Sequence, residues 1–114
     1  MQEFLDAITA NGIKRDVCIM GGEPLATQNR FLTALMCKTV REKFPDVKIY
    51  IWTGYTVEQL SEETDPKLLS ILDGKYADFL IDGPFQIADR DITLFMRGSS
   101  NQRIIPLPYK KGEQ

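Results

Sequence analysis

Three short runs of strand-forming residues, separated by segments with helical spacing, constrain the fold of this chain more than any other sequence feature. The runs span residues 17–20, 47–53 and 77–81, and each contains valine, isoleucine or aromatic residues, which favour strands. Strands that alternate with helices along a chain indicate right-handed βαβ units. We therefore expect an α/β fold built on a parallel sheet.

The longest helical segment begins after Asn29, which is a favourable N-cap residue, and ends before Pro45. We expect its apolar stripe to pack into the core and its basic residues to lie on the solvated side. The expected stripe comprises Phe31, Leu32, Leu35, Met36, Val40 and Phe44, and the basic residues are Arg30, Lys38, Arg41 and Lys43. Residues 1–10 predict a further helix that leads into the first strand.

Short polar signals place the remaining elements. Thr56 and Gln59 fit a capping box, in which a hydroxyl and an amide satisfy the first peptide groups of a helix. Asp65 and the proline after it begin the next helix, and Gly74 ends that helix. Residues 102–107 predict a last strand after a polar, irregular segment.

Length and charge bound the class of protein. The 114 residues suit a single domain, with residues 108–114 as a frayed tail. The net charge of −2 gives no general reason to expect nucleic acid or an acidic membrane as a partner. No apolar run is long enough to span a membrane, and the first residues do not resemble a signal peptide. We therefore expect a cytoplasmic protein.

The sequence contains no histidine and two cysteines. The lack of histidine excludes Ser-His-Asp triads, Cys-His pairs and histidine-ligated zinc sites. Cys18 lies in a predicted strand and Cys37 on a predicted helix, and we expect both to be buried core residues. We therefore expect no self-contained metal site of the usual kinds.

Each of the three predicted strands ends in a turn that contains glycine, and in a parallel sheet such turns lie side by side. The turns are Gly21-Gly22-Glu23, Thr53-Gly54-Tyr55 and Asp82-Gly83-Pro84. Parallel sheets bind ligands beyond the carboxyl ends of their strands, and glycine lets a backbone approach a ligand closely. An ordinary turn explains any one of these segments, but their coincidence favours a shared ligand pocket.

A second polar stretch, residues 97–103, carries two guanidinium groups, two hydroxyl groups and two amides. This composition suits a polar or anionic ligand, and it also suits a solvated loop before a strand. Neither of the usual glycine-rich phosphate-binding motifs is present.

Four segments together resemble the activating proteins of anaerobic ribonucleoside-triphosphate reductases, a family of radical S-adenosylmethionine (radical SAM) enzymes. The segments are residues 21–25, 51–55, 80–85 and 97–104. The Gly-Gly-Glu-Pro motif is shared widely among radical SAM enzymes, whereas Trp-Thr-Gly-Tyr and Arg-Gly-Ser-Ser-Asn-Gln-Arg are more specific to this family. The resemblance extends over residues 1–107.

The resemblance implies part of a partial (β/α) barrel that binds S-adenosylmethionine and a [4Fe-4S] cluster. Reductive cleavage of S-adenosylmethionine, with an electron donor such as flavodoxin, would give a 5′-deoxyadenosyl radical. That radical would remove a hydrogen atom from a glycine of the partner, the anaerobic reductase. The enzyme class implied is a glycyl-radical-activating oxidoreductase.

The family motifs also imply the residues that bind the cofactor. The first turn would contact the methionyl ammonium largely through backbone carbonyls, and the next two strand ends would line the pocket. The stretch 97–103 would contact the cofactor or the partner. The implied residues are Gly21, Gly22, Glu23, Pro24, Thr53, Asp82, Ser99 and Asn101.

The sequence departs from the family at the cluster motif CxxxCxxC, because Cys18 is the sole cysteine before Gly21. A cluster of this kind needs three thiolate ligands. We therefore expect an incomplete radical SAM domain over residues 1–114, without a metal site and without catalysis by itself. A missing neighbouring strand would leave an apolar edge exposed at residues 17–20, which favours self-association.

Two alternatives stay open from the sequence. One is a non-catalytic module that docks on the reductase. The other is an unrelated doubly wound domain that binds a nucleotide-like ligand at the same edge of the sheet.

Overall fold

The computed structural model describes residues 2–12, 15–84, 86, 90, 97 and 99–109 of the chain. Along these residues the elements are α1 (Gln2–Ile8), η1 (Ala10–Gly12), β1 (Val17–Ile19), η2 (Thr27–Asn29), α2 (Arg30–Lys43), β2 (Ile49–Trp52), α3 (Val57–Ser61), α4 (Pro66–Leu72), β3 (Phe79–Asp82) and β4 (Arg103–Pro106), where η marks a 3-10 helix. None of the helices in this part of the chain is long and apolar enough to cross a membrane.

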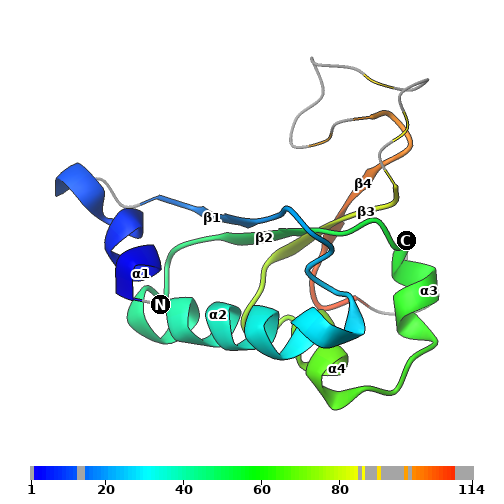
Figure 1. The fold of residues 1–114 in the computed structure, drawn as a ribbon, viewed down its shortest axis with the longest axis horizontal. Coiled ribbons are helices and arrows are strands. Elements are labelled where there is room, and N and C mark those ends of the chain that lie inside the picture. The colour runs from blue at the N-terminus through cyan, green and yellow to red at the C-terminus, as the bar shows by residue number, and fades with distance from the viewer. Residues whose placement is uncertain are drawn as a thin grey trace.

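The four strands form one mixed sheet in the order β1-β2-β3-β4 (Figure 1). β1 pairs with β2 and β2 with β3 in parallel, whereas β3 pairs with β4 in antiparallel. The prediction of an α/β fold with a parallel sheet is thus confirmed for β1 to β3 and wrong for β4. The last residue of β3, Asp82, pairs with the first residue of β4, Arg103. The chain therefore re-enters the sheet at the end where β3 leaves it, and β4 runs in the opposite direction.

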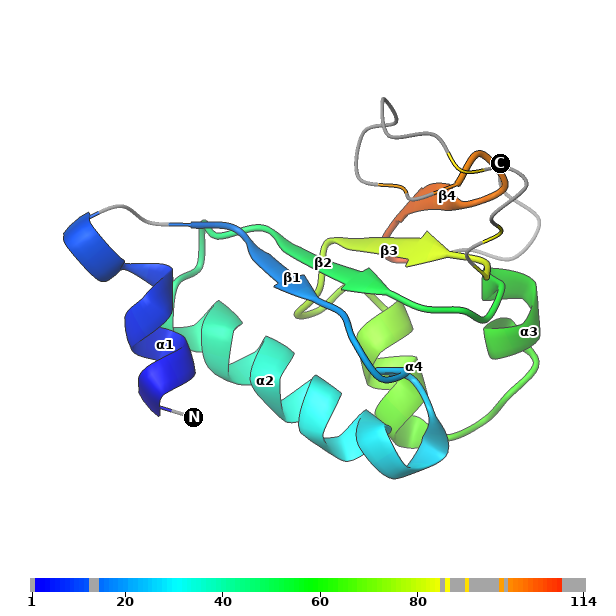
Figure 2. The same cartoon turned by 45° about the horizontal axis from the view of Figure 1, so that its top comes forward.

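The helices cover one face of the sheet (Figures 1 and 2). α1, α2 and α4 lie along this face, whereas α3 lies beyond the carboxyl ends of the parallel strands. At the centre of the core, Ile49, Ile51 and Leu80 are fully buried. Each such side chain stabilises the fold by about 1.5–3 kcal/mol relative to an exposed position. This layer therefore holds the strand ends, and with them the turns, in place.

Helix α2 packs on the sheet with a face that matches the predicted stripe only in part. The prediction is confirmed for Val40, which is fully buried, and for Met36 and Phe44, which pack against the core, and it is wrong for Phe31, Leu32 and Leu35. The buried residues of α2 are Arg30, Thr33, Cys37 and Val40. The exposed fractions of Phe31, Leu32 and Leu35 are 66%, 55% and 40%. The apolar spacing did not predict this face because it depends on a distant contact. Arg30, which we expected on the solvated side, is buried and pairs with the carboxylates of Glu63 and Asp65.

The predicted helix starts are confirmed at α3 and α4. Gln59 donates its N–H to the Thr56 hydroxyl at 3.2 Å, and Thr56 donates its N–H to the Gln59 side chain at 2.8 Å. Asp65 accepts the N–H of Lys67 at 3.0 Å and caps α4. At α2, Asn29 occupies the N-cap position but makes no side-chain capping bond.

Gly74 follows α4 with a φ of +76° and lies against the end of the described chain. A Cβ at this position would come within 2.5 Å of the backbone nitrogen of Pro108. Tyr109, in the segment predicted to fray, donates its N–H to the Leu72 carbonyl at 3.0 Å and packs against the core. Residues 110–114 of that predicted tail lie outside the described residues.

β1 forms one edge of the sheet, with β2 as its neighbour. Val17 and Ile19 face the core, whereas Cys18 between them is exposed, as strand alternation requires. The prediction of a buried side chain is therefore wrong for Cys18. It is confirmed for Cys37, where burial raises the pKa of the thiol to about 12.

We expect the β1 edge to pair with the same edge of a second copy as protein concentration rises, because no strand of the described part of the chain lies next to its outer peptide groups. Sedimentation velocity in reducing buffer should show an average mass that increases with concentration. The Cys18→Lys variant places a charge at the centre of this edge and should reduce the association. Thr64→Lys adds the same charge at an exposed position between α3 and α4 and should behave like the wild type. A wild-type chain that stays monomeric at all concentrations would contradict the expectation.

Candidate functional site

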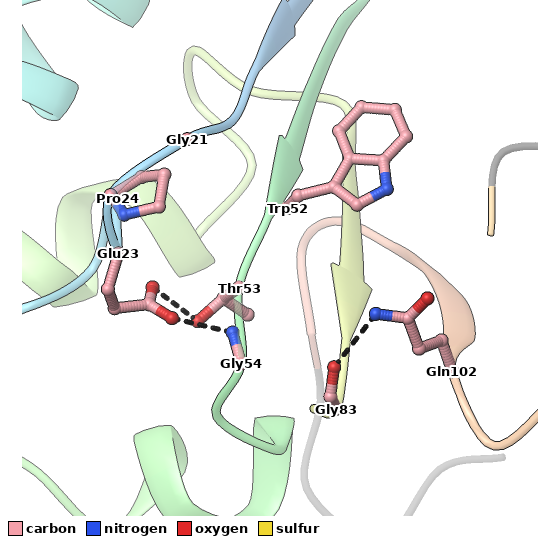
Figure 3. Close-up of a pocket in the computed structure, with 9 residues that line it drawn as sticks. Gly21, Glu23, Pro24, Trp52, Thr53, Gly54, Gly83 and Gln102 are labelled. Carbon is pink, nitrogen blue, oxygen red and sulfur yellow. Dashed lines mark hydrogen bonds between the residues drawn. The ribbon is translucent and has the colours of Figure 1, made fainter. Parts of the chain in front are cut away.

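A cavity of about 280 Å³ lies at the carboxyl ends of β1, β2 and β3 (Figure 3). It is lined by Gly21, Gly22, Glu23, Pro24, Trp52, Thr53, Gly54, Gly83 and Gln102. All three predicted turns contribute to it, as expected for parallel strands that end at one edge. Five of the predicted site residues are among these, and the remaining three, Asp82, Ser99 and Asn101, are not.

The carboxylate of Glu23 joins the first turn to the second. Its Oε1 atom accepts the N–H of Gly54 at 2.6 Å, and its Oε2 atom accepts the Thr53 hydroxyl at 2.7 Å. The same Oε2 atom also accepts the N–H of Leu25 at 3.0 Å. Hydrogen bonds to a carboxylate are stronger than those between neutral groups. Glu23 therefore fixes the distance between the ends of β1 and β2, and three donors occupy its side chain.

Side chains at the start of helix α2 donate hydrogen bonds to the carbonyl groups in the rest of the first turn. Asn29 donates from its side-chain amide to the carbonyl of Glu23 at 2.9 Å, and Thr33 donates its hydroxyl to the carbonyl of Pro24 at 2.8 Å. Arg30 donates from Nε to the carbonyl of Leu25 at 2.7 Å. The start of α2 thus fixes three successive carbonyl groups of this turn.

Arg30 is itself held by carboxylates from the α3–α4 connection. Its Nη1 and Nη2 atoms lie 2.8 Å and 2.9 Å from the two carboxylate oxygens of Glu63, and Nη1 lies 3.2 Å from Asp65. Hydrogen bonding to Glu63 raises the pKa of Arg30, and the same bonds lower the pKa of Glu63. This arrangement keeps the guanidinium charged although it is 3% exposed.

Gly21 and Gly22 differ from the residues that follow them. Both have a positive φ, +80° and +26°, and both are exposed. Their peptide groups form no hydrogen bond with another described residue. A Cβ on either would meet no protein atom within 4 Å. These two residues therefore present peptide groups without a described partner at the cavity. The residues that follow them in the turn are held by hydrogen bonds.

Trp52 adds an aromatic side chain to the cavity, and it is not among the site residues predicted from the sequence. It is half-buried, and its ring lies 6.4 Å from that of Tyr50, which stacks on Phe79 at 5.1 Å. The indole N–H of Trp52 has no hydrogen-bond partner among the described residues. Its place beside Thr53 in the Trp-Thr-Gly-Tyr motif is the sequence signal that could have identified it.

Gln102 closes the cavity opposite the first turn. Its side chain donates to the carbonyl of Gly83 at 3.0 Å and accepts the N–H of Ser99 at 3.2 Å (Figure 3). Ser99 is buried and donates its hydroxyl to Asn101, which donates to the carbonyl of Pro84 at 2.7 Å. Ser99 and Asn101 therefore stabilise the turn after β3 by hydrogen bonds without lining the cavity. Gln102 is the described residue of this loop that lines it.

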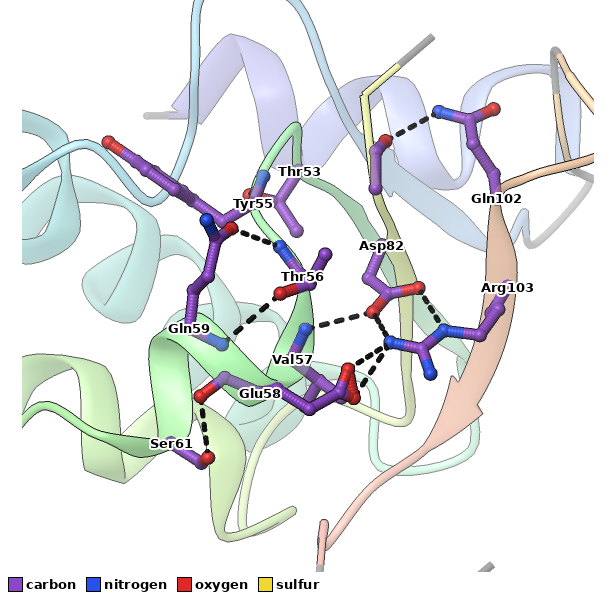
Figure 4. A network of polar contacts seen from close by, with 11 residues as sticks. Thr53, Tyr55, Thr56, Val57, Glu58, Gln59, Ser61, Asp82, Gln102 and Arg103 are labelled. Atoms are coloured by element: carbon purple, nitrogen blue, oxygen red, sulfur yellow. Dashed lines mark hydrogen bonds and ion pairs between the residues drawn. The ribbon is translucent and has the colours of Figure 1, made fainter. Parts of the chain in front are cut away.

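Asp82 lies behind the cavity wall, fully buried at the end of β3. Its Oδ2 atom accepts the N–H of Val57 at 2.8 Å, and its Oδ1 atom accepts Nε of Arg103 at 3.0 Å (Figure 4). Arg103 also pairs with Glu58, which lowers the pKa of that carboxyl, while hydrogen bonding to Asp82 raises the pKa of Arg103. Asp82 thus ties the start of α3 and the start of β4 to the end of β3.

Sequence comparison gives independent information on this site. Residues 1–105 match the model of the 4Fe-4S single cluster domain family. The chain belongs to this family.

Curated relatives in the family carry a more specific name. They include anaerobic ribonucleoside-triphosphate reductase-activating proteins from Pasteurella multocida, 34% identical over 103 residues, and Haemophilus influenzae, 33% identical over 104 residues. Each of these alignments covers 90% of this chain and 63% of the relative. The protein of that name from enterobacteria phage T4 is 37% identical over 86 residues, which cover 75% of this chain and 49% of the relative. The predicted resemblance is confirmed, and the chain spans less than two thirds of the relatives' length. No solved structure matches significantly.

The cysteines of this chain do not fit the iron-sulfur cluster that the family's name implies. Cys37 is fully buried in the core, and Cys18 is the other cysteine, on the exposed face of β1. Among the described residues, no group of three or more His, Cys, Asp or Glu side chains could hold a metal ion. The cavity, in contrast, combines the peptide groups of Gly21 and Gly22, which have no partner among the described residues, with the ring of Trp52, and this lining suits a small polar ligand.

We expect Glu23→Gln to destabilise the protein by about 1–3 kcal/mol, because an amide group would face donors that now share a carboxylate. Urea unfolding measures this loss. Trp52, the chain's single tryptophan, reports on the cavity itself through its fluorescence. Glu42→Gln, at an exposed position on α2, is the matched control and should change stability by less than about 0.5 kcal/mol. Equal stabilities of the two variants would disprove the bridging role of Glu23.

The ion pairs around the cavity predict a loss of stability in acid. The pKa of Glu58 is lowered in the folded state by Arg103, so its contribution is complete above the ordinary value of 4.5 and is lost as pH falls through the folded pKa. The free energy of unfolding should decrease as the pH falls below this value. Glu58→Gln should flatten that decrease, whereas Glu42→Gln should leave the slope unchanged. Parallel pH profiles for wild type and Glu58→Gln would contradict the assignment.

Proposed function

We propose that this chain is the S-adenosylmethionine-binding part of an activating protein for an anaerobic ribonucleoside-triphosphate reductase. The observation that carries the proposal is the turn at Gly21 and Gly22, whose peptide groups are unpaired within the described chain and face a cavity. The names of the relatives support the reductase as the target. The Gly-Gly-Glu-Pro motif supports the cofactor, through the resemblance to radical SAM enzymes. The sheet would then be part of a partial (β/α) barrel.

In this proposal the cavity residues have two kinds of role. The carbonyl groups of Gly21 and Gly22 accept hydrogen bonds from the methionyl ammonium group. Glu23 does not contact the ligand through its side chain, because Thr53 and Gly54 already occupy it. The predicted ligands Asp82, Ser99 and Asn101 act through the cavity wall, because their polar groups hold the turn after β3 and the start of β4.

The chemistry of activation needs more than this cavity. S-adenosylmethionine supplies a 5′-deoxyadenosyl radical when a reduced [4Fe-4S] cluster provides the electron. Because the two cysteines do not fit such a cluster, we assign ligand binding and partner recognition to this chain, and not cleavage of the sulfonium. We accordingly propose that the chain by itself is catalytically inactive.

Calorimetry with S-adenosylmethionine should show binding at one site, together with a change in Trp52 fluorescence. Gly21→Ala should weaken binding at least tenfold, because relaxing the positive φ displaces the peptide groups that face the ligand. Gly12→Ala is the matched control, since Gly12 has a φ of +74° and equally open space around a Cβ. Both variants should lose about 1–2 kcal/mol of stability, but Gly12→Ala should bind as the wild type does.

The same samples separate this proposal from its alternatives. Binding of ATP without a response to S-adenosylmethionine would favour an unrelated nucleotide-binding domain. After anaerobic treatment with iron and sulfide, the chain should give no 5′-deoxyadenosine from S-adenosylmethionine and dithionite. Stoichiometric [4Fe-4S] absorption with formation of that product would overturn the assignment of binding without cleavage.

A further inference from the structure

Helix α2 carries apolar side chains that stay exposed in the part of the chain that the structure describes. Phe31 and Leu35 are one turn apart and are exposed by 66% and 40%. They lie in a groove of about 320 Å³ between α2 and α4, which is lined by Phe31, Ala34, Leu35, Lys38, Ser70 and Tyr76. Single exposed apolar residues are common on protein surfaces, but residues that share one groove mark an interaction site more often.

This groove is separate from the ligand cavity. No described residue lines both of them. The groove is lined from α2 and α4, two helices of the layer that covers the sheet (Figure 2), whereas the cavity lies at the ends of the strands (Figure 3). A partner that binds the groove therefore leaves the cavity open.

The charges around the groove are positive. Lys38 lines it and forms no ion pair with another described residue. Lys67 precedes Ser70 by one helical turn on α4, and the ammonium group of Lys75 lies 5.4 Å from the centre of the Tyr76 ring. None of the described lining residues carries a carboxylate. The groove is therefore apolar at its centre and basic at its margin, on a chain whose net charge is −2.

Three carboxylates of the same helical layer are neutralised by arginines, whereas Glu42 and Asp73 are exposed and form no ion pair with another described residue. Glu63 and Asp65, just before α4, are paired with Arg30. Asp78, just after Tyr76, is paired with Arg41. Glu42 and Asp73 do not line the groove, so Lys38 is the charged residue that a partner would meet among the described lining residues.

We propose that this groove docks an amphipathic segment of the anaerobic reductase that carries apolar side chains flanked by carboxylates. The identity of the partner rests on the proposed function, whereas the chemistry of the segment rests on the groove. Helices commonly bind such grooves through apolar residues one turn apart. A second copy of this chain is a poorer occupant, because two-fold symmetry would place the same basic margin against itself.

The test is the affinity of the chain for the purified anaerobic reductase encoded by the same genome, measured by calorimetry. Leu35→Glu places a carboxylate in the groove and should weaken binding at least tenfold. Leu69→Glu makes the same change at a residue of similar exposure, 44% against 40%, that lines a different cavity on α4, and should bind as the wild type does. Lys38→Glu should weaken binding and reduce its dependence on salt.

Each outcome decides the proposal. Equal binding by Leu35→Glu and Leu69→Glu would overturn it, as would a wild-type chain that does not bind the reductase. Loss of self-association in Leu35→Glu, with reductase binding unchanged, would instead make the groove an interface between copies and would also overturn it. Titration of each variant with S-adenosylmethionine reports on the cavity separately, so failure of the docking proposal is distinguishable from failure of the proposed function. Circular dichroism confirms that each variant is folded.

Discussion

The bridge formed by the Glu23 carboxylate is the interaction on which the geometry of the cavity depends. Two turns that follow different strands would otherwise be related only through the sheet, because neither contains another charged group that reaches across. One carboxylate accepts donors from Thr53, Gly54 and Leu25, and so sets the spacing of both turns. The proposed ligand surface at Gly21 and Gly22 is therefore preorganised by a residue whose own side chain is occupied by donors of the protein.

A buried guanidinium has a comparable influence on the helical layer. Arg30 occupies a core-facing position of α2, and its pairing with Glu63 and Asp65 decides which side of the helix faces the sheet. Burial of an unpaired charge would be strongly destabilising, so the acidic pair is required for this arrangement. As a consequence, Phe31 and Leu35 face outward although their spacing favours burial.

Local signals allowed the strands, the capping of α3 and α4 and the convergence of three turns to be predicted from the sequence. These features depend on neighbouring residues and on the rule that parallel strands end at one edge. Three features depend on contacts between distant segments, and the spacing of apolar residues along the sequence does not reveal such contacts. They are the antiparallel β4, the buried face of α2 and the position of Gln102. Asp82 shows the same limit: its place at a strand end suggested a ligand, but Arg103 and Val57 occupy its carboxylate.

The first turns of α2 connect the two surfaces of this chain. The carbonyl groups of the first turn are held by Asn29, Arg30 and Thr33. Phe31 lies between these residues in sequence but lines the groove beside α4. Helical geometry makes this division possible, because residues that are adjacent in sequence project about 100° apart around the axis. A helix fixed on one side by charged and hydroxyl groups can present apolar side chains on the other without loss of its own position. The proposed ligand site and the proposed docking groove therefore depend on one helix and use different faces of it.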